Sequence, residues 1–296
     1  MINTVTGPVK LGTLGQTLPH EHIVCSGAEF QSTFPGWLPE ETVLNIAVAK
    51  LKYAAETYQI RTVIDGTPLT LGRDLPLLKK ASERSGVQII ASTGFYFYDS
   101  FPLIKMPPEG ISEFLTDEII NGEIKPAIFK CAADVQGITP TVKKALQAAA
   151  LVHKETGIPI YCHTHAAVKS GTAAQEILLE CGVNPSKLVF GHVSDSNDVP
   201  YALDLLKKGS FVSIDRVHPH NAAFAEELIR AGFADRIFLG HDHICCGDLV
   251  MTGAPQNEPY GLDVVHGKIL PEMKASGVDP ETIRKITTEN IITLFS

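Results

Sequence analysis

The sequence predicts an α/β protein with a (β/α)8 TIM barrel. Three observations support this. Eight short β-branched segments alternate with amphipathic ones, potential metal ligands stand near several segment ends, and no Gly-rich dinucleotide fingerprint follows the first segment. A doubly wound sheet is the alternative, but it rarely needs eight strands and normally carries that fingerprint. The 296 residues, 44% of them hydrophobic, allow a large core. We expect a single domain over residues 1–296.

Each expected strand is a short run rich in β-branched or other apolar residues. Such runs suit parallel strands that are covered on both faces, as the strands of a barrel are. The expected strands are Thr17–Ile23, Arg61–Thr67, Val87–Phe95, Pro126–Ala133, Pro159–Ala166, Leu188–Ser194, Ser210–Asp215 and Arg236–His243.

Amphipathic segments fill the intervals between these strands. In Val142–Val152 the apolar residues recur with a helical period, and alanines provide a small packing face. Thr139 before Pro140 and Asn197 before Asp198 are expected helix caps. Helix ends are expected at Gly86, Gly157, Gly182 and Gly209. The clearest expected helices are Glu40–Gln59, Leu75–Ser85, Thr139–Thr156 and Thr172–Cys181.

Charge and composition exclude several classes of protein. The formal charge of −8, the pI near 5.8 and the lack of a basic run argue against nucleic-acid binding. The apolar stretches are far shorter than a bilayer span, and the first residues lack the pattern of a signal peptide. Six cysteines without zinc-finger spacing are typical of reduced thiols in a long chain. We therefore expect a cytoplasmic enzyme with a small-molecule substrate and no membrane partner.

His20 and His22 lie in the first expected strand. Side chains two residues apart on a strand point to the same face, so both imidazoles project together and could hold one metal ion. A lone His-x-His is a weak signal. Its weight here comes from four later strands that each end in a possible ligand.

The four later candidates are Lys130, His163, His192 and Asp242. A carboxylate such as Asp242 suits a hydrolytic metal site, where one position must stay open for water. An ammonium group at Lys130 would be repelled by bound cations. If the lysine amine has reacted with carbon dioxide, however, the resulting carbamate is an anion that could bridge two metal ions.

The motifs of this chain resemble those of the phosphotriesterase family of the amidohydrolase superfamily. They occur in the expected order over nearly the whole chain. The matching segments are Leu18-Pro19-His20-Glu21-His22, Gly72-Arg73-Asp74, Ser92-Thr93-Gly94-Phe95-Tyr96, Lys130-Cys131-Ala132-Ala133-Asp134, His163-Thr164-His165, Gly191-His192 and Gly240-His241-Asp242.

The resemblance implies a ligand set for a binuclear metal centre. His20, His22 and Asp242 would bind the more buried ion, and His163 and His192 the more exposed one. Carboxylated Lys130 and a hydroxide would bridge both. Zinc is the expected metal, and cobalt, manganese and iron are alternatives, because histidine and carboxylate ligands accept all of them. The resemblance also implies a homodimer.

The substrate class follows from finer features of the sequence. Tyr96 stands where the dedicated organophosphate hydrolases carry tryptophan, and the phosphotriesterase-like lactonases have a tyrosine there. The run Lys130–Thr139 and the segment Ile214-Asp215-Arg216 also look more like the lactonases. Gly247–Gly267 departs from the lactonase loop that shapes the acyl pocket. The longest loop-rich regions, 99–125 and 244–268, are the expected pocket walls.

These features predict hydrolysis of a lactone or related carboxylic ester by a metal-bridging hydroxide. Asp242 would accept the proton and pass it to the leaving group, Tyr96 would help to polarise the carbonyl, and Arg216 would hold or gate the substrate. A main phosphotriesterase (aryldialkylphosphatase) activity is the alternative, because the same centre could attack phosphorus. A non-catalytic binding barrel is the third hypothesis. No Gly-x-Ser-x-Gly motif supports a serine hydrolase.

Overall fold

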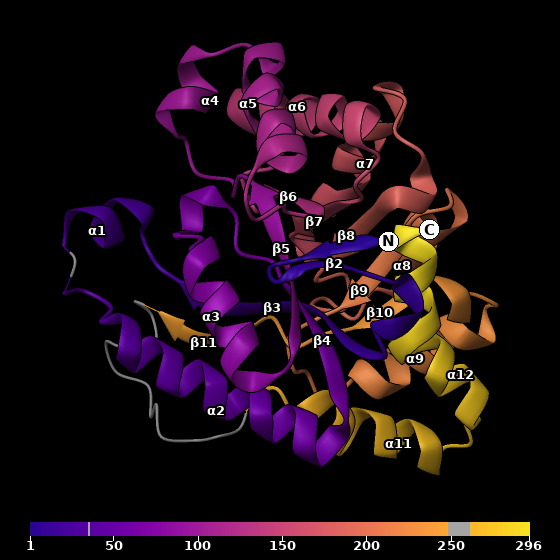
Figure 1. Ribbon diagram of the computed structural model, residues 1–296. Helices are drawn as coiled ribbons and strands as arrows, with labels where there is room; N and C mark the ends of the chain where they lie inside the picture. The colour runs from indigo at the N-terminus through magenta and orange to yellow at the C-terminus, as the bar shows by residue number, and fades with distance from the viewer. Residues whose placement is uncertain (35, 248–260) are drawn as a thin grey trace.

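The computed structural model describes residues 1–34, 36–247 and 261–296. Their main sheet is entirely parallel and has the strand order β10-β9-β8-β7-β6-β5-β4-β3-β11 (Figure 1). The two outer strands of this order, β10 and β11, follow one another in the chain, and β11 pairs with β3. They are two pieces of the eighth strand, which closes the barrel against the first. The predicted TIM barrel is confirmed.

All eight predicted strands are present, with ends that differ by a few residues. The eighth was predicted as continuous but is interrupted at residues 240–242. The strands of the main sheet are β3 (Gln16–Cys25), β4 (Ile60–Asp65), β5 (Gln88–Gly94), β6 (Ile128–Ala133), β7 (Ile160–Thr164), β8 (Leu188–Gly191), β9 (Phe211–Ile214), β10 (Ile237–Leu239) and β11 (His243–Gly247). A small hairpin of β1 (Ile2–Thr4) and β2 (Gly7–Val9) precedes them.

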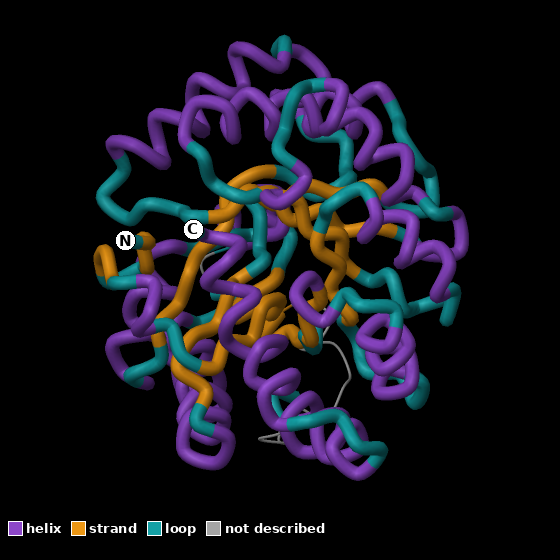
Figure 2. The backbone as a smooth tube through the Cα atoms, turned by 90° about the vertical axis from the view of Figure 1, so that its right-hand side faces the viewer, coloured by secondary structure: helices purple, strands orange, loops and turns teal. Residues whose placement is uncertain are grey.

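Helices cover the outside of the strands (Figure 2). They are α1 (Ala28–Thr33), α2 (Glu40–Tyr58), α3 (Leu75–Ser85), α4 (Phe101–Lys105), α5 (Pro108–Asn121), α6 (Pro140–Thr156), α7 (Ser170–Glu180), α8 (Val199–Lys207), α9 (Asn221–Arg230), α11 (Leu270–Ala275), α12 (Pro280–Arg284) and α13 (Asn290–Phe295). The four predicted helices are confirmed, and Thr139 caps α6 as expected. The structure describes no helix long and apolar enough to cross a bilayer.

Two local expectations, on the cap of α8 and on region 99–125, were wrong. The cap of α8 is Asp198, whose carboxylate accepts the Tyr201 N–H, and not Asn197. Region 99–125 is mostly helical: α5 buries Ile111, Leu115 and Ile119, whose spacing of four residues forms a helical stripe. Region 244–268 contains most of β11 and a π-helical turn at Val265–Ile269. Its residues 248–260 lie outside those described.

The barrel interior holds one apolar side chain from each of seven neighbouring strands. These residues are Ile64, Ile90, Ile128, Tyr161, Val189, Phe211 and Phe238. Because side chains alternate along a strand, the next inward positions after Ile128 and Tyr161 belong to Lys130 and His163. The packed interior thus forms a floor beneath the polar residues at the carboxyl ends of the strands, where barrel enzymes place their active sites.

Candidate metal centre

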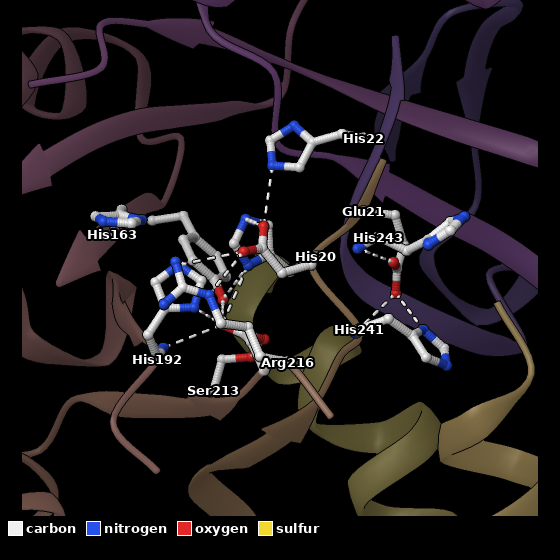
Figure 3. A network of polar contacts seen from close by, with 12 residues as sticks. His20, Glu21, His22, His163, His192, Ser213, Arg216, His241 and His243 are labelled. Carbon is white, nitrogen blue, oxygen red and sulfur yellow. Dashed lines mark hydrogen bonds and ion pairs between the residues drawn. The ribbon is translucent and has the colours of Figure 1, made fainter. Parts of the chain in front are cut away.

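The six predicted ligands come together at the carboxyl ends of the strands. Figure 3 shows the four histidines among them. Two lie on β3, one on β6 and one on β7, while His192 follows β8 and Asp242 stands between β10 and β11. Five are buried, and the Asp242 side chain is 17% exposed. The residues are His20, His22, Lys130, His163, His192 and Asp242.

Asp242 is the centre of the cluster. Its Oδ1 lies 3.4 Å from His20 Nε2 and 3.2 Å from His22 Nε2, and its Oδ2 lies 3.9 Å from His192 Nε2. His20, His192 and Asp242 form a group able to hold a metal ion, with ligand atoms within 4.8 Å of one another. His163 packs against His192 with ring centroids 4.4 Å apart.

Hydrogen bonds at Nδ1 orient His20 and His22. His20 Nδ1 lies 3.1 Å from an Asp215 carboxylate oxygen. His22 Nδ1 lies 2.8 Å from the Thr67 hydroxyl, which donates its own hydrogen to the Val24 carbonyl. Both rings therefore carry a proton on Nδ1 and turn Nε2 toward the cluster. Partners of this kind commonly fix the tautomer of metal-binding histidines.

His192 provides the clearest indication of a missing partner. Both of its ring nitrogens are buried, and neither has a hydrogen-bond partner among the described residues. Burial holds the pKa of His192 well below its ordinary value, so the ring is neutral at physiological pH. Buried polar atoms without partners are rare in folded proteins. A metal ion bound by this neutral imidazole would satisfy one of these nitrogens.

Lys130 is buried, and its amine has no ion-pair partner among the described residues. Its Nζ atom lies 2.5 Å from His20 Nε2 and 4.4 Å from the centre of the Tyr161 ring, and no described carboxylate forms an ion pair with it. Burial lowers the pKa of the Lys130 amine. A neutral amine has a free lone pair and can add to carbon dioxide, so the environment fits the predicted carbamate.

Asp215 forms hydrogen bonds that hold residues of the cluster in place. This fully buried carboxylate accepts hydrogen bonds from the Tyr161 hydroxyl (2.6 Å) and the His192 backbone N–H (3.2 Å), in addition to its contact with His20. A Cβ atom at Gly191 or Gly240 would lie only 2.8 or 2.7 Å from its oxygens. Glycine at these two positions lets the ends of β8 and β10 approach the carboxylate.

Tyr96 and Asp134 lie beside His163. The Tyr96 hydroxyl is 3.5 Å from His163 Nε2, and an Asp134 carboxylate oxygen is 2.8 Å from the same nitrogen. Burial, followed by the nearby charges of Asp134 and Asp242, raises the pKa of Tyr96. Its hydroxyl therefore stays protonated at any physiological pH and can donate a hydrogen bond.

Arg216 lies over the open side of Asp242. Its Nε atom is 3.2 Å from Asp242 Oδ2, and its Nη1 atom is 2.5 Å from Asp195 Oδ2. The side chain is 41% exposed, and guanidinium keeps its charge in proteins. Arg216 can therefore add positive charge at the mouth of the site but cannot exchange protons with Asp242.

Backbone strain is concentrated in this site. His192, Arg216 and Asp242 have φ values of 64°, 57° and 54°, in the left-handed region that L-residues rarely adopt. Each follows a strand of the barrel. Strain of this kind persists where surrounding contacts determine the conformation, and it is common at functional sites.

Several site residues were not predicted from the sequence. Asp215, Thr67 and Tyr161 orient the histidines, and Asp134 contacts His163. The end of a barrel strand was the available signal for Asp215, which stands one residue before Arg216. The same signal was available for Thr67, whose partner Asp65 ends β4 and accepts its N–H.

Histidines and a carboxylate gathered at the carboxyl ends of parallel barrel strands are the arrangement of metal-dependent barrel hydrolases. The chain matches the phosphotriesterase family model over residues 1–295. It is 31% identical to the phosphotriesterase homology protein of Mycobacterium tuberculosis over 320 residues, covering 99% of this chain and 97% of the relative. The chain therefore belongs to the phosphotriesterase family, which confirms the resemblance seen in its motifs.

Two further relatives bear the names of hydrolytic enzymes. The chain is 32% identical over 302 residues to an aryldialkylphosphatase of Saccharolobus solfataricus, covering 96% of this chain and 95% of the relative. It is 26% identical over 339 residues to an N-acetyltaurine hydrolase of Xenopus tropicalis, covering 98% of this chain and 96% of the relative. The family thus contains hydrolases that act on chemically different bonds.

Proposed function

We propose that the protein is a binuclear metal-dependent hydrolase of lactones or related carboxylic esters. The observation that carries the hydrolytic part is the buried cluster of imidazoles around Asp242, in which His192 has no hydrogen-bond partner among the described residues. The lactone part rests on Tyr96, a protonated hydroxyl beside His163.

The six clustered residues would hold two divalent metal ions. His20, His22 and Asp242 would bind one ion, His163 and His192 the other, and carboxylated Lys130 would contribute to both. When bound, the ions would lower the pKa of a coordinated water and supply a nucleophile at neutral pH. We expect zinc, with cobalt, manganese or iron as alternatives.

The side chains around the centre supply proton transfer and charge stabilisation. Asp242 accepts the proton of the attacking water and delivers it to the leaving alkoxide. The Tyr96 hydroxyl donates a hydrogen bond to the carbonyl oxygen, which becomes negative as the nucleophile adds. Arg216, beside Asp242 at the mouth, attracts the polar part of the substrate.

A cavity of about 1080 Å³ near the carboxyl end of β3 supports a substrate with an apolar part. It is lined by Cys25 and Ser26, where β3 ends, and by Met106 and Phe114, in the region predicted to form a pocket wall. None of the six predicted ligands lines it. We propose that it receives the apolar group of the ester while the carbonyl lies at the cluster.

Phosphotriester hydrolysis as the main activity is the second candidate. The observation in its favour is the 32% identity to a relative named aryldialkylphosphatase. A metal centre alone does not discriminate between carbon and phosphorus, so the pocket must decide. Tyr96, in place of a tryptophan, favours the smaller planar carbonyl.

Reconstitution with defined metals tests the proposal. Metal-free protein is loaded with Zn²⁺, Co²⁺ or Mn²⁺, its bound metal is quantified, and hydrolysis of a lactone panel is compared with that of a dialkyl aryl phosphate. We expect about two ions per chain and a higher kcat/KM for at least one lactone. A chain that binds no metal contradicts the hydrolase proposal, and a preference for the phosphotriester contradicts only its lactonase part.

For assembly and location, we propose a cytoplasmic homodimer. Exposed aromatic residues on or just after α1 and on α5, among them Phe30, Phe34 and Phe114, support a protein contact. The cysteines at positions 131, 162, 181, 245 and 246 are free thiols, as expected in a reducing compartment. Light scattering of the purified protein distinguishes a dimer from a monomer.

A further inference from the structure

We infer that Glu21, the residue between His20 and His22, is a positioning residue that fixes Asp242 in the metal centre. This inference rests on the proposed function. Strand alternation turns Glu21 away from the two histidines, and Figure 3 shows it directed toward His241, on the other side of the strand from the cluster. The segment therefore serves the site on both faces of β3.

The Glu21 carboxylate is fully buried and accepts three hydrogen bonds from the residues that flank Asp242. Its Oε1 atom accepts from the His241 backbone N–H at 3.1 Å and from His241 Nδ1 at 2.6 Å. Its Oε2 atom accepts from the His243 backbone N–H at 3.0 Å. Both neighbours of Asp242 are thus attached to one side chain.

The amide of Asp242 itself is attached to the same strand. Its N–H donates to the His20 carbonyl at 3.0 Å. Three consecutive amides, those of residues 241–243, therefore all donate to residues 20 and 21. This pattern holds Asp242 at a φ of 54°, which an aspartate rarely adopts without such support. In this conformation the Asp242 carboxylate reaches the histidines.

The direction of each hydrogen bond requires a carboxylate at position 21. His241 Nε2 accepts the Val265 N–H at 3.1 Å, so the ring proton lies on Nδ1 and is donated to Glu21. All three groups facing Glu21 are therefore donors. Glutamine has one oxygen and one NH₂ group, so its NH₂ would face a donor at one end and lose that contact.

Cobalt spectroscopy of Glu21→Gln provides a readout that does not depend on turnover. The visible absorption of protein-bound Co²⁺ reports the geometry of its ligands. We expect an altered spectrum and a Co²⁺ affinity lower by about 10- to 100-fold, as is typical when a residue that supports a metal ligand is lost. We also expect a larger fold-change in kcat than in KM. The matched control is Asn290→Ala, which removes hydrogen bonds to Ala234 and Ile237 at the opposite end of β10. This control should lower stability and leave the Co²⁺ spectrum unchanged.

A second pair of variants covers the case in which Glu21→Gln does not fold. His241→Asn can place an amide N–H where Nδ1 donates to Glu21, whereas His241→Gln places its amide farther out and cannot. We expect the asparagine variant to keep the wild-type Co²⁺ spectrum and the glutamine variant to change it. Identical spectra for His241→Gln, or for a folded Glu21→Gln, and the wild type would overturn the role of Glu21. A wild type that binds no Co²⁺ would instead overturn the metal centre itself.

Discussion

The amine of Lys130 and the imidazole of His20 meet 2.5 Å apart in the interior of the barrel, and each side chain is only 1% exposed. Burial lowers both pKa values, that of His20 to about 4, with Lys130 as the next largest cause. The short contact allows the amine and the imidazole to share one proton, and no described carboxylate forms an ion pair with the amine. Carbon dioxide or a metal ion would complete the arrangement.

Lys130→Ala tests the carbamate. We expect the variant to lose most of one metal equivalent and nearly all activity, because the anionic bridge disappears. Added bicarbonate or short carboxylic acids should restore part of both, since they can occupy the space that the side chain leaves. Metal analysis and steady-state rates, with and without these additives, provide the measurement. Wild-type turnover in unsupplemented Lys130→Ala protein would contradict the assignment.

Asp242→Asn removes the proposed proton acceptor and keeps the shape of the side chain. We expect kcat to fall by about 10²- to 10⁴-fold, the range for loss of a general base, together with weaker metal binding. Both effects arise because an amide is neither a strong ligand nor a base. Rates are to be compared at equal metal occupancy. A near-normal rate at neutral pH would exclude Asp242 as the proton shuttle.

Tyr96→Phe separates the two substrate classes. The hydroxyl supplies one donor to a developing oxyanion, so lactone hydrolysis should slow by roughly ten- to a thousand-fold. Phosphotriester hydrolysis should stay equal or rise, because the bulkier tetrahedral substrate gains space. Both activities are measured on wild type and variant with the same metal loading. Equal loss of both activities would contradict the lactonase interpretation and leave the metal site intact.

Gly240→Ala tests the close approach of β10 to Asp215. The added Cβ would lie 2.7 Å from Asp215 Oδ1 and 3.3 Å from His20 Cβ, and both neighbours are buried. We expect a loss of about 1–3 kcal/mol in the free energy of unfolding, as in other overpacked cores. Gly12→Ala, where the new atom meets nothing within 4 Å, is the control. Urea denaturation of metal-free protein should separate the two variants, and equal midpoints would contradict the steric argument.

His266 should make the stability of the fold depend on pH. Burial, followed by His241 and Lys274, lowers the pKa of His266 from 6.5 to about 4. Between these values the unfolded chain takes up a proton that the folded chain does not, so stability falls as pH drops from 6.5 toward 4. Neither His266 ring nitrogen has a hydrogen-bond partner among the described residues. His266→Phe should therefore retain the packing and flatten the stability curve in this window. Thermal unfolding of metal-free protein at several pH values measures the difference, and parallel curves would contradict it.

The barrel could be predicted because its signals are local and periodic. Leu75–Ser85 was predicted with both ends correct, and Gly86, its expected end, follows in the left-handed conformation. The structure adds the cap, Asp74. Helix α5 was missed although Ile111, Leu115 and Ile119 repeat every four residues. Its polar surroundings and the prolines before it resembled a loop.

The candidate site was predictable only in part, for a physical reason. Side chains near strand ends, such as His163 and Asp242, can be recognised in the sequence by residue type and position. The supporting contacts depend on three-dimensional proximity, which no spacing reveals: His20 and Asp215 are 195 residues apart, and Glu21 and His241 are 220 apart. The break in the eighth strand was equally hidden, because the break depends on hydrogen bonds from residues 241–243 to β3.

That break also has a consequence for the order of events during folding. The segment between β10 and β11, where the barrel closes, also places Asp242 beside the histidines. A folding intermediate that lacks only the eighth strand would leave the hydrogen-bonding edges of β3 and β9 open to other chains. Such an intermediate would also lack Asp242 in the proposed metal centre. Metal added early in refolding should thus favour the species whose last strand has docked, and should reduce aggregation by withdrawing chains from the open state.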